Sequence, residues 1–329
     1  MRYYIRKLAF YVVALWAALT LNFFIPRLMP GNPVDTLMAR LQQRGGSVDP
    51  SVRRAYELLL GTDTQQPLWD QYVAYLGNLV RGDLGISVSV FPTPASEVIF
   101  QSLPWTIVLV GIATLMSFAL GIVLGTVVGW KRGTWLDSLV PATTVLAAVP
   151  YFWLALILVA VFGSALRWFP LLGGYDVVFD PGWNAEFVQS AIFHGTLPAL
   201  TIVISSVGGW LLGMRNMMVS AMSEDYILTA RAKGLRNSRI MTHYAARNAV
   251  LPSVAGFAIS LGFVVSGSIL TEQVFSYPGI GGKLLQAVQN NDYALMQGIF
   301  LVITVAVLGA NLVVDLLYGL IDPRTRAGQ

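Results

Sequence analysis

The sequence predicts an all-α integral membrane protein with six transmembrane helices and a small external helical region between the first and second. Composition is the first indication: 55% of the 329 residues are hydrophobic, 12% are charged and the mean hydropathy is +0.64. A soluble domain carries about 25% charged residues, and this chain could not bury so much apolar side-chain area inside a soluble fold. The other two observations are a series of long apolar runs and the placement of basic residues between them.

The first span is expected from Leu8 to about Ile25, within a first segment of residues 1–28. Arg2, Arg6 and Lys7 precede the apolar run, as in a signal peptide, but no pair of small residues marks a cleavage site after it. We therefore predict an uncleaved transmembrane helix that begins inside the cell.

Residues 29–101 form the only long hydrophilic region of the chain. Apolar residues recur at helical spacing in two stretches, residues 50–60 and residues 67–80, which are separated by residues 61–64. We expect two short amphipathic helices in a folded external region, with a solvated linker as the alternative.

The remaining core, residues 102–329, is predicted to hold five spans, at residues 104–130, 136–163, 196–214, 251–270 and 296–320. In the first of these, Gly121, Gly125 and Gly129 recur every four residues, a pattern that lets helices in lipid approach closely. Pro141 and Pro150 lie inside the next, where prolines free backbone carbonyls and kink a helix.

Basic residues orient these spans. Thirteen Arg and Lys residues fall on the side where the chain starts, whereas the short loops of the opposite side hold only Arg167 and Lys283. Cytoplasmic loops carry this excess, and a region as long as residues 29–101 is exempt from the rule. The sequence thus predicts a multi-pass protein of the plasma membrane with both termini in the cytoplasm. The scattered bases give no clustered polar surface for nucleic acid.

Residues 223–250 form a basic hairpin, with five bases and two acids, inside the apolar second half. Ser223 is the expected N-cap of its first helix, followed by acidic residues where the helix dipole is positive. Gly234 is the expected left-handed stop, and Asn237 or Ser238 is expected to cap a second helix that runs to about Asn248. An ordinary basic cytoplasmic loop remains the alternative.

The series from Thr229 to Leu235 (TARAKGL), followed by Pro252 eighteen residues after Gly234, resembles the cytoplasmic loop of ABC importer permeases. The resemblance is to the dipeptide/oligopeptide/nickel branch, because Leu228 and Thr229 stand where the general importer signature has Glu and Ala. Segments with the same resemblance are residues 30–33, 81–87 and 272–281.

This resemblance implies a type I importer permease whose hairpin is a coupling helix that contacts an ATPase subunit. It also implies the partners: a second homologous permease subunit in a heterodimer, two ABC ATPase subunits and an extracytoplasmic substrate-binding protein. ATP and magnesium would be held by the ATPase subunits, in a bacterial or archaeal membrane. The coupling residues that it implies are Asp225, Tyr226, Thr229, Ala230, Arg231, Ala232, Lys233, Gly234 and Leu235.

Enzymatic chemistry is not indicated. The Gly-Gly-Lys at residues 281–283 lacks the Ser or Thr of a phosphate loop, and the apolar segments hold no catalytic or metal-ligand cluster. The absence of cysteine excludes disulfides and thiolate metal sites, and His194 and His243 have no carboxylate companions at ligand spacing. We therefore expect a transporter subunit without an ATPase site and without a bound cofactor or metal.

Ionisable residues within or beside spans suggest a translocation path, and here they are Glu272 and Asp315. The alternative is that Glu272 is interfacial and that Asp315 pairs with a neighbouring helix. The resemblance implies peptides as the expected substrate, and oligosaccharides or nickel remain alternatives within the same architecture. An ATP-independent channel or a secondary carrier is the other class, although no internal repeat is visible in the sequence.

Overall fold

The structure, a computed structural model, describes residues 2–43, 50–60, 66–265 and 268–321. These residues are helical with connecting loops, and Ile86 and Pro94 form one isolated β-bridge. Backbone contacts divide the chain into two compact units. The first comprises Met1–Thr106, Val265–Ile269 and Pro278–Leu312, and the second comprises Ile107–Val264, Leu270–Tyr277 and Val313–Gln329.

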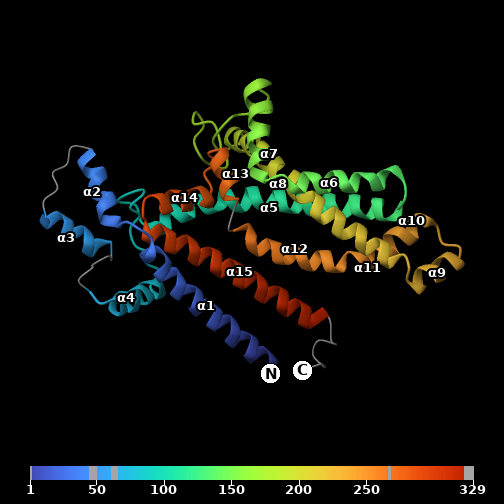
Figure 1. The fold of residues 1–329 in the computed structure, drawn as a ribbon, viewed down its shortest axis with the longest axis horizontal. Coiled ribbons are helices and arrows are strands. Elements are labelled where there is room, and N and C mark those ends of the chain that lie inside the picture. The colour runs from blue at the N-terminus through green and yellow to red at the C-terminus, as the bar shows by residue number, and fades with distance from the viewer. Residues whose placement is uncertain (1, 44–49, 61–65, 266–267, 322–329) are drawn as a thin grey trace. The chain divides into compact units, whose positions relative to one another are not determined.

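The described part of the first unit consists of helices and their connections, which are labelled in Figure 1. They are α1 (Arg2–Leu28), α2 (Pro33–Gln43), α3 (Pro50–Leu59), α4 (Leu68–Val80), the first turns of α5 (Ala95–Trp130), α14 (Ile280–Gln289) and most of α15 (Tyr293–Ile321). Helices α3 and α4 confirm the two predicted helices within a residue at each end. The predicted separator at residues 61–64 lies outside the described residues.

Helix α2 was not predicted. Asn32 begins it by accepting a hydrogen bond from the Val34 N–H at 2.9 Å, and Pro33 occupies the first helical position. Asparagine at the N-cap followed by proline is a helix-start signal. That signal was present in the sequence and would have located the helix.

Helix α4 packs on the second half of α1 through its aromatic side chains. Tyr72 Oη lies 2.8 Å from Thr20 Oγ1, and the Tyr72 ring meets the Phe23 ring edge-on at 5.2 Å between centroids. Helix α1 is tied in turn to α15, because Asn22 Nδ2 donates to the Gln297 carbonyl at 2.8 Å. The apolar core of this unit comes from α5, α14 and α15 and comprises Ala95, Val98, Ile99, Ile280, Leu284, Ala287, Leu295, Met296 and Ile299.

The second unit is organised around α8 (Ala185–Ala221). The short helices α6 (Leu139–Ala148) and α7 (Tyr151–Leu158) pack along it, and α5 lies beside it (Figure 1). The other helical segments are the 3-10 turn Trp135–Ser138, the π-helical turn Val159–Ala165, α9 (Asp225–Ala232), α10 (Asn237–Arg239), the π-helical turn Ile240–Ala246, α11 (Arg247–Ala249), α12 (Leu251–Val264) and most of α13 (Ile269–Val274).

The glycine stripe of α5 makes the close contact that its spacing predicted. A β-carbon placed on Gly125 would lie 2.6 Å from the Leu211 carbonyl oxygen, and one on Gly129 would lie 2.6 Å from Met218 Cβ. A β-carbon on Gly121 would likewise collide with Trp210 Cβ. Only glycine allows α5 and α8 to approach this closely.

Four helices in the described residues are long and apolar enough to cross a membrane: Ile5–Leu28, Ala95–Trp130, Ala185–Ala221 and Tyr293–Val313. A fifth span results if Asn237–Ala249 and Leu251–Val264, which are bent by 50° relative to one another, are one span. The predicted third span is not one helix, because α6 ends at Ala148 and α7 begins after Pro150. Proline lacks the N–H that would continue the ladder across this break.

Other span boundaries differ from those predicted. Helix α8 extends beyond residues 196–214 at both ends, and its start is fixed by Asn184, whose side chain accepts from the Phe187 N–H at 2.8 Å. Helix α12 is shorter than the predicted span of residues 251–270, since it ends at Val264.

Candidate functional site

The predicted coupling hairpin begins where α8 ends, and its first helix is α9. Ser223 is not the N-cap that was predicted. Its hydroxyl donates to the Ser220 carbonyl at 2.8 Å, and its N–H donates to the same oxygen at 3.2 Å, so Ser223 closes α8 instead. Glu224 occupies the N-cap position without a side-chain bond, and Asp225 supplies the acidic first turn.

The end of α9 confirms the predicted glycine stop. Gly234 has φ +69°, and its N–H donates to the Arg231 carbonyl at 2.9 Å. The Leu235 N–H donates to the Ala230 carbonyl at 3.3 Å. These two bonds make a Schellman motif, with Lys233 as the C-cap, which ends the helix at a defined residue.

The second helix of the hairpin starts one residue earlier than predicted. Arg236 takes the N-cap position, and Asn237 and Ser238 both lie inside the helix. The helix passes through the π-helical turn Ile240–Ala246, which no local sequence signal indicated, before the 50° bend into α12. Pro252 follows at the second position of α12, where a missing N–H costs little.

A buried apolar cluster fixes the hairpin to α8. Met214, Met218 and Ala221 come from α8, Ile227 and Ala230 from α9, and Ile240, Ala245 and Ala249 from the second helix. Ala230 is therefore 2% exposed. Of the two alanines of α9, Ala230 packs against the buried cluster and only Ala232 is exposed to solvent.

The outer face of α9 carries most of the remaining predicted residues. Tyr226 and Leu235 are half-buried, and the exposed ones are Asp225, Thr229, Arg231, Ala232, Lys233 and Gly234. Sequence reasoning missed Leu228, a large apolar side chain that is 57% exposed on this otherwise polar helix. It lies one turn before Ala232 on the same helix face. Its departure from the general importer signature was the available signal.

An ion pair fastens α8 close to the hairpin core and was also not predicted. Arg215 Nη2 lies 2.8 Å and 3.0 Å from the two carboxylate oxygens of Asp137, and its Nε lies 3.1 Å from Oδ1. Arg215 follows Met214, which belongs to the hairpin core. This two-point contact joins α8 to the 3-10 turn Trp135–Ser138 next to that core.

Of the two candidate translocation residues, only the side chain of Glu272 lies within the described residues. Glu272, in α13, is fully buried, and its carbonyl accepts from the Tyr277 N–H at 2.8 Å. Burial raises the pKa of Tyr277 above its ordinary value, and the nearby Glu272 carboxylate raises that pKa further. The side chain of Asp315, in α15, lies outside the described residues. Within the described part of the chain, no group of three or more His, Asp or Glu residues could hold a metal ion.

Comparison with known proteins identifies the family. Residues 121–327 match the family described as the binding-protein-dependent transport system inner membrane component. The di/tripeptide transport system permease protein DppB of Pseudomonas aeruginosa is 34% identical, over 98% of this chain and 97% of that protein. The oligopeptide permease AppB of Bacillus subtilis is 31% identical over 98% of both chains, and the dipeptide permease DppB of Escherichia coli is 31% identical over 99% of both. The chain belongs to the inner membrane components of binding-protein-dependent transport systems, and it is a multi-pass permease of an ABC importer.

Proposed function

We propose that this chain is a permease subunit of an ATP-driven peptide importer and forms half of the translocation pathway. The observation that carries the substrate class is that the three relatives above, which align over almost their whole length, are all named as peptide permeases. The partners of the proposal are a second homologous permease in a heterodimer, two ABC ATPase subunits that hold ATP and magnesium, and an extracytoplasmic substrate-binding protein.

The proposed topology has six spans, with both termini in the cytoplasm. The segments are a first span in residues 1–28, an external region at 29–101, and a core at 102–329. The six proposed crossings are the four long apolar helices, the helix α12 that follows the hairpin, and the apolar helix Tyr151–Ala165 with α6 before it. The excess of bases on one side supports the orientation.

Because the chain has no cysteine, single introduced cysteines test this topology directly. Ala232→Cys and Trp183→Cys both place the thiol on an exposed residue, on opposite proposed sides. A membrane-impermeant maleimide should label Trp183→Cys in intact spheroplasts and Ala232→Cys only in inverted vesicles. Labelling of both from one side contradicts the topology.

The outer face of α9 is the proposed contact with the ATPase. Leu228 presents an apolar side chain beside small Ala232, and Arg231 and Lys233 flank them with positive charge. An apolar side chain between charged neighbours suits insertion into a groove on another protein. Because α9 is fixed to α8 by buried side chains, movement of the ATPase would be transmitted to a long apolar helix. In this proposal Glu272 and Asp315 line the pathway that those movements open.

Two matched variants test the coupling. Leu228→Ser and Ala232→Trp change only the exposed face of α9, whereas Thr242→Ser conserves the hydroxyl of an exposed residue on the second helix. We expect both to lower substrate-stimulated ATPase activity of the reconstituted importer about tenfold or more, because Leu228→Ser removes an apolar contact and Ala232→Trp adds a bulky ring at a close contact. Thr242→Ser should keep that activity. Full activity in both α9 variants, with normal membrane insertion, would remove α9 from the mechanism.

Substrate and energy source need a separate measurement. Uptake by proteoliposomes that contain the whole importer and its binding protein should require ATP inside the vesicles and a di- or oligopeptide outside. Uptake of an oligosaccharide or of nickel instead would change the substrate class. Uptake by the permease without ATPase subunits would indicate a channel or secondary carrier.

A further inference from the structure

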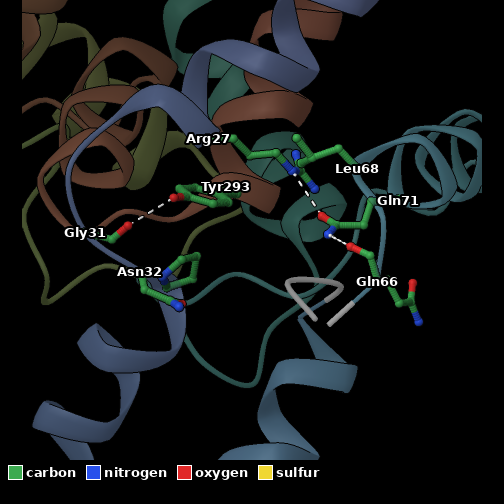
Figure 2. A pocket seen from close by; sticks show the side chains of 8 residues that line it. Arg27, Gly31, Asn32, Gln66, Leu68, Gln71 and Tyr293 are labelled. Carbon is green, nitrogen blue, oxygen red and sulfur yellow. Dashed lines mark hydrogen bonds between the residues drawn. The ribbon is translucent and has the colours of Figure 1, made fainter. Parts of the chain in front are cut away.

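A cavity of about 310 Å³ lies at the end of α1 in the first unit. Its walls come from the last turn of α1, the start of α2, the start of α4 and the first residue of α15, as Figure 2 shows. The residues that matter for its chemistry are Arg27, Asn32, Gln66, Leu68, Gln71 and Tyr293. None of the described residues that line it is acidic.

Arg27 brings a positive charge to this cavity without a negative partner. Its Nη1 donates to the Phe23 carbonyl at 3.0 Å and its Nε to Gln71 Oε1 at 3.4 Å, and both acceptors are neutral. Its guanidinium carbon also lies 3.7 Å from the centroid of the Phe23 ring. Among the described residues, no carboxylate lies within ion-pair distance of Arg27. A half-buried charge that lacks a counter-ion is unfavourable, so an anion in the cavity would be stabilised.

Asn32 adds a donor to the cavity, and two further hydrogen bonds fix its walls. Asn32 accepts the Val34 N–H through Oδ1, which leaves its amide nitrogen as a donor at the start of the eleven-residue helix α2. The positive end of that helix dipole also favours an anion. Tyr293 Oη donates to the Gly31 carbonyl at 3.2 Å, and Gln71 Nε2 donates to the Gln66 carbonyl at 3.0 Å (Figure 2). Both bonds hold the walls in place before any ligand arrives.

The acids of α2 and α3 do not compete for Arg27. Asp35, in the first turn of α2, does not line the cavity and lies 2.8 Å from Arg53 Nη1. Arg53 also contacts Glu57 at 3.1 Å, so these acids already have a cation. Arg27 is therefore available to a ligand.

We propose that this cavity binds the phosphate of an anionic phospholipid. Arg27 lies in the last turn of an apolar span, Ile5–Leu28, so the cavity lies where a membrane surface would meet that span. The residues beside it are apolar and exposed: Leu28 is 82% exposed, Leu68 57% and Trp69 69%. Tryptophan is enriched at this level of a membrane protein, and a guanidinium matches the paired oxygens of a phosphate. The bound headgroup joins the ends of α1, α2, α4 and α15.

Binding is measured on the delipidated full-length chain in a neutral detergent, without ATPase or binding protein. Native mass spectrometry would compare phosphatidylglycerol with a diacylglycerol of the same acyl chains, which lacks the phosphate. We expect phosphatidylglycerol to bind at least about tenfold more tightly, the difference of one charge-assisted contact. Because no transport is measured, this result is independent of the proposed substrate and of the proposed coupling.

Four variants test whether the charge of Arg27 is responsible for lipid binding. Gln71→Glu keeps the shape of a residue that already accepts from Arg27, but it supplies an internal carboxylate that replaces the lipid. We expect about a tenfold loss of phosphatidylglycerol binding with no lower unfolding temperature, which separates lost binding from lost folding. Arg27→Gln should lose binding to the same extent, and Arg27→Lys should keep part of it. Arg81→Gln, on an exposed arginine at the end of α4 outside the cavity, should change nothing.

Four outcomes overturn the proposal. The diacylglycerol could bind as tightly as phosphatidylglycerol, or Gln71→Glu could bind the lipid unchanged. Millimolar inorganic phosphate could displace the lipid completely, which would assign the cavity to a free anion. A dipeptide could displace it, which would assign the cavity to a substrate carboxylate.

Discussion

Replacing Gly125 with alanine is expected to force α5 away from α8 and to destabilise the second unit. A β-carbon at this position would lie 2.6 Å from the Leu211 carbonyl oxygen, 2.8 Å from Met214 Cβ and 3.1 Å from the Arg215 nitrogen. Two of these three atoms belong to the backbone of α8. They cannot turn aside as the end of a flexible side chain can, so the whole helix must shift.

The size of the effect follows from that distance. Ordinary van der Waals contact begins at 3.4 Å, so α5 and α8 must separate by roughly 0.8 Å. A separation of this size weakens the dispersion contacts between the two helices. Overpacking of this kind costs about 1–3 kcal/mol. Alanine recovers about 1 kcal/mol over glycine inside a helix. The expected net loss in the free energy of unfolding is therefore up to about 2 kcal/mol.

Gly213→Ala, on α8, is the matched control, because a β-carbon there has no atom within 4 Å. Thermal unfolding of the full-length chain in detergent, followed by far-ultraviolet circular dichroism, compares the two variants. Gly125→Ala should unfold at a lower temperature than the parent, and Gly213→Ala at the same or a higher one. Equal unfolding temperatures for the two variants would show that the α5–α8 contact can accommodate a β-carbon at residue 125 without loss of stability.

Three further predictions concern Gly234, Asp292 and Tyr75. Gly234→Ala has space but must keep φ +69°, so it should cost about 1 kcal/mol and speed hydrogen exchange in α9, whereas unchanged exchange would contradict this. Asp292 is fully buried and its Oδ2 accepts from Ser87 Oγ at 2.6 Å and Ser89 N at 2.8 Å, so Asp292→Asn should lower thermal stability by about 1–3 kcal/mol. Burial raises the pKa of Tyr75 to about 12 from 10.0, so the unfolded chain loses the Tyr75 proton at a lower pH than the folded chain does. The free energy of unfolding should therefore fall as the pH rises from 10 to 12. Tyr75→Phe should show a smaller fall over that window, and identical profiles would exclude the effect.

Local patterns predicted the helices well but not their interruptions. The glycine spacing of α5 predicted a close helix–helix contact because a four-residue repeat places side chains on one face of any helix, but it did not predict that α8 is the partner. Proline did not act uniformly. Pro104 lies inside α5 and Pro198 inside α8, whereas the chain breaks at Pro150. Whether a helix continues through proline depends on groups that satisfy the freed carbonyls, which are distant in sequence.

The hairpin shows the same division. Gly234 could be predicted because a left-handed stop depends on the residue itself. The role of Ser223 could not be predicted in this way, because its hydroxyl donates to the Ser220 carbonyl at the end of α8 and does not cap α9. Ala230 and Ala232 are equally small, and only the packing against α8 makes the first a core residue and the second a surface residue.

A continuous line of packed side chains leads from the hairpin into the apolar helices. Ile227 of α9 is buried in the same cluster as Met218 of α8, and Met218 meets α5 at Gly129, where a β-carbon would lie 2.6 Å from Met218 Cβ. Interiors packed this tightly move as units and do not deform continuously. In the proposed mechanism, an ATPase that displaces α9 must therefore carry α8 and α5 with it. The close contact between the glycines of α5 and α8 then serves coupling as well as stability. If that contact were weakened, α9 and α8 could move while α5 stays in place.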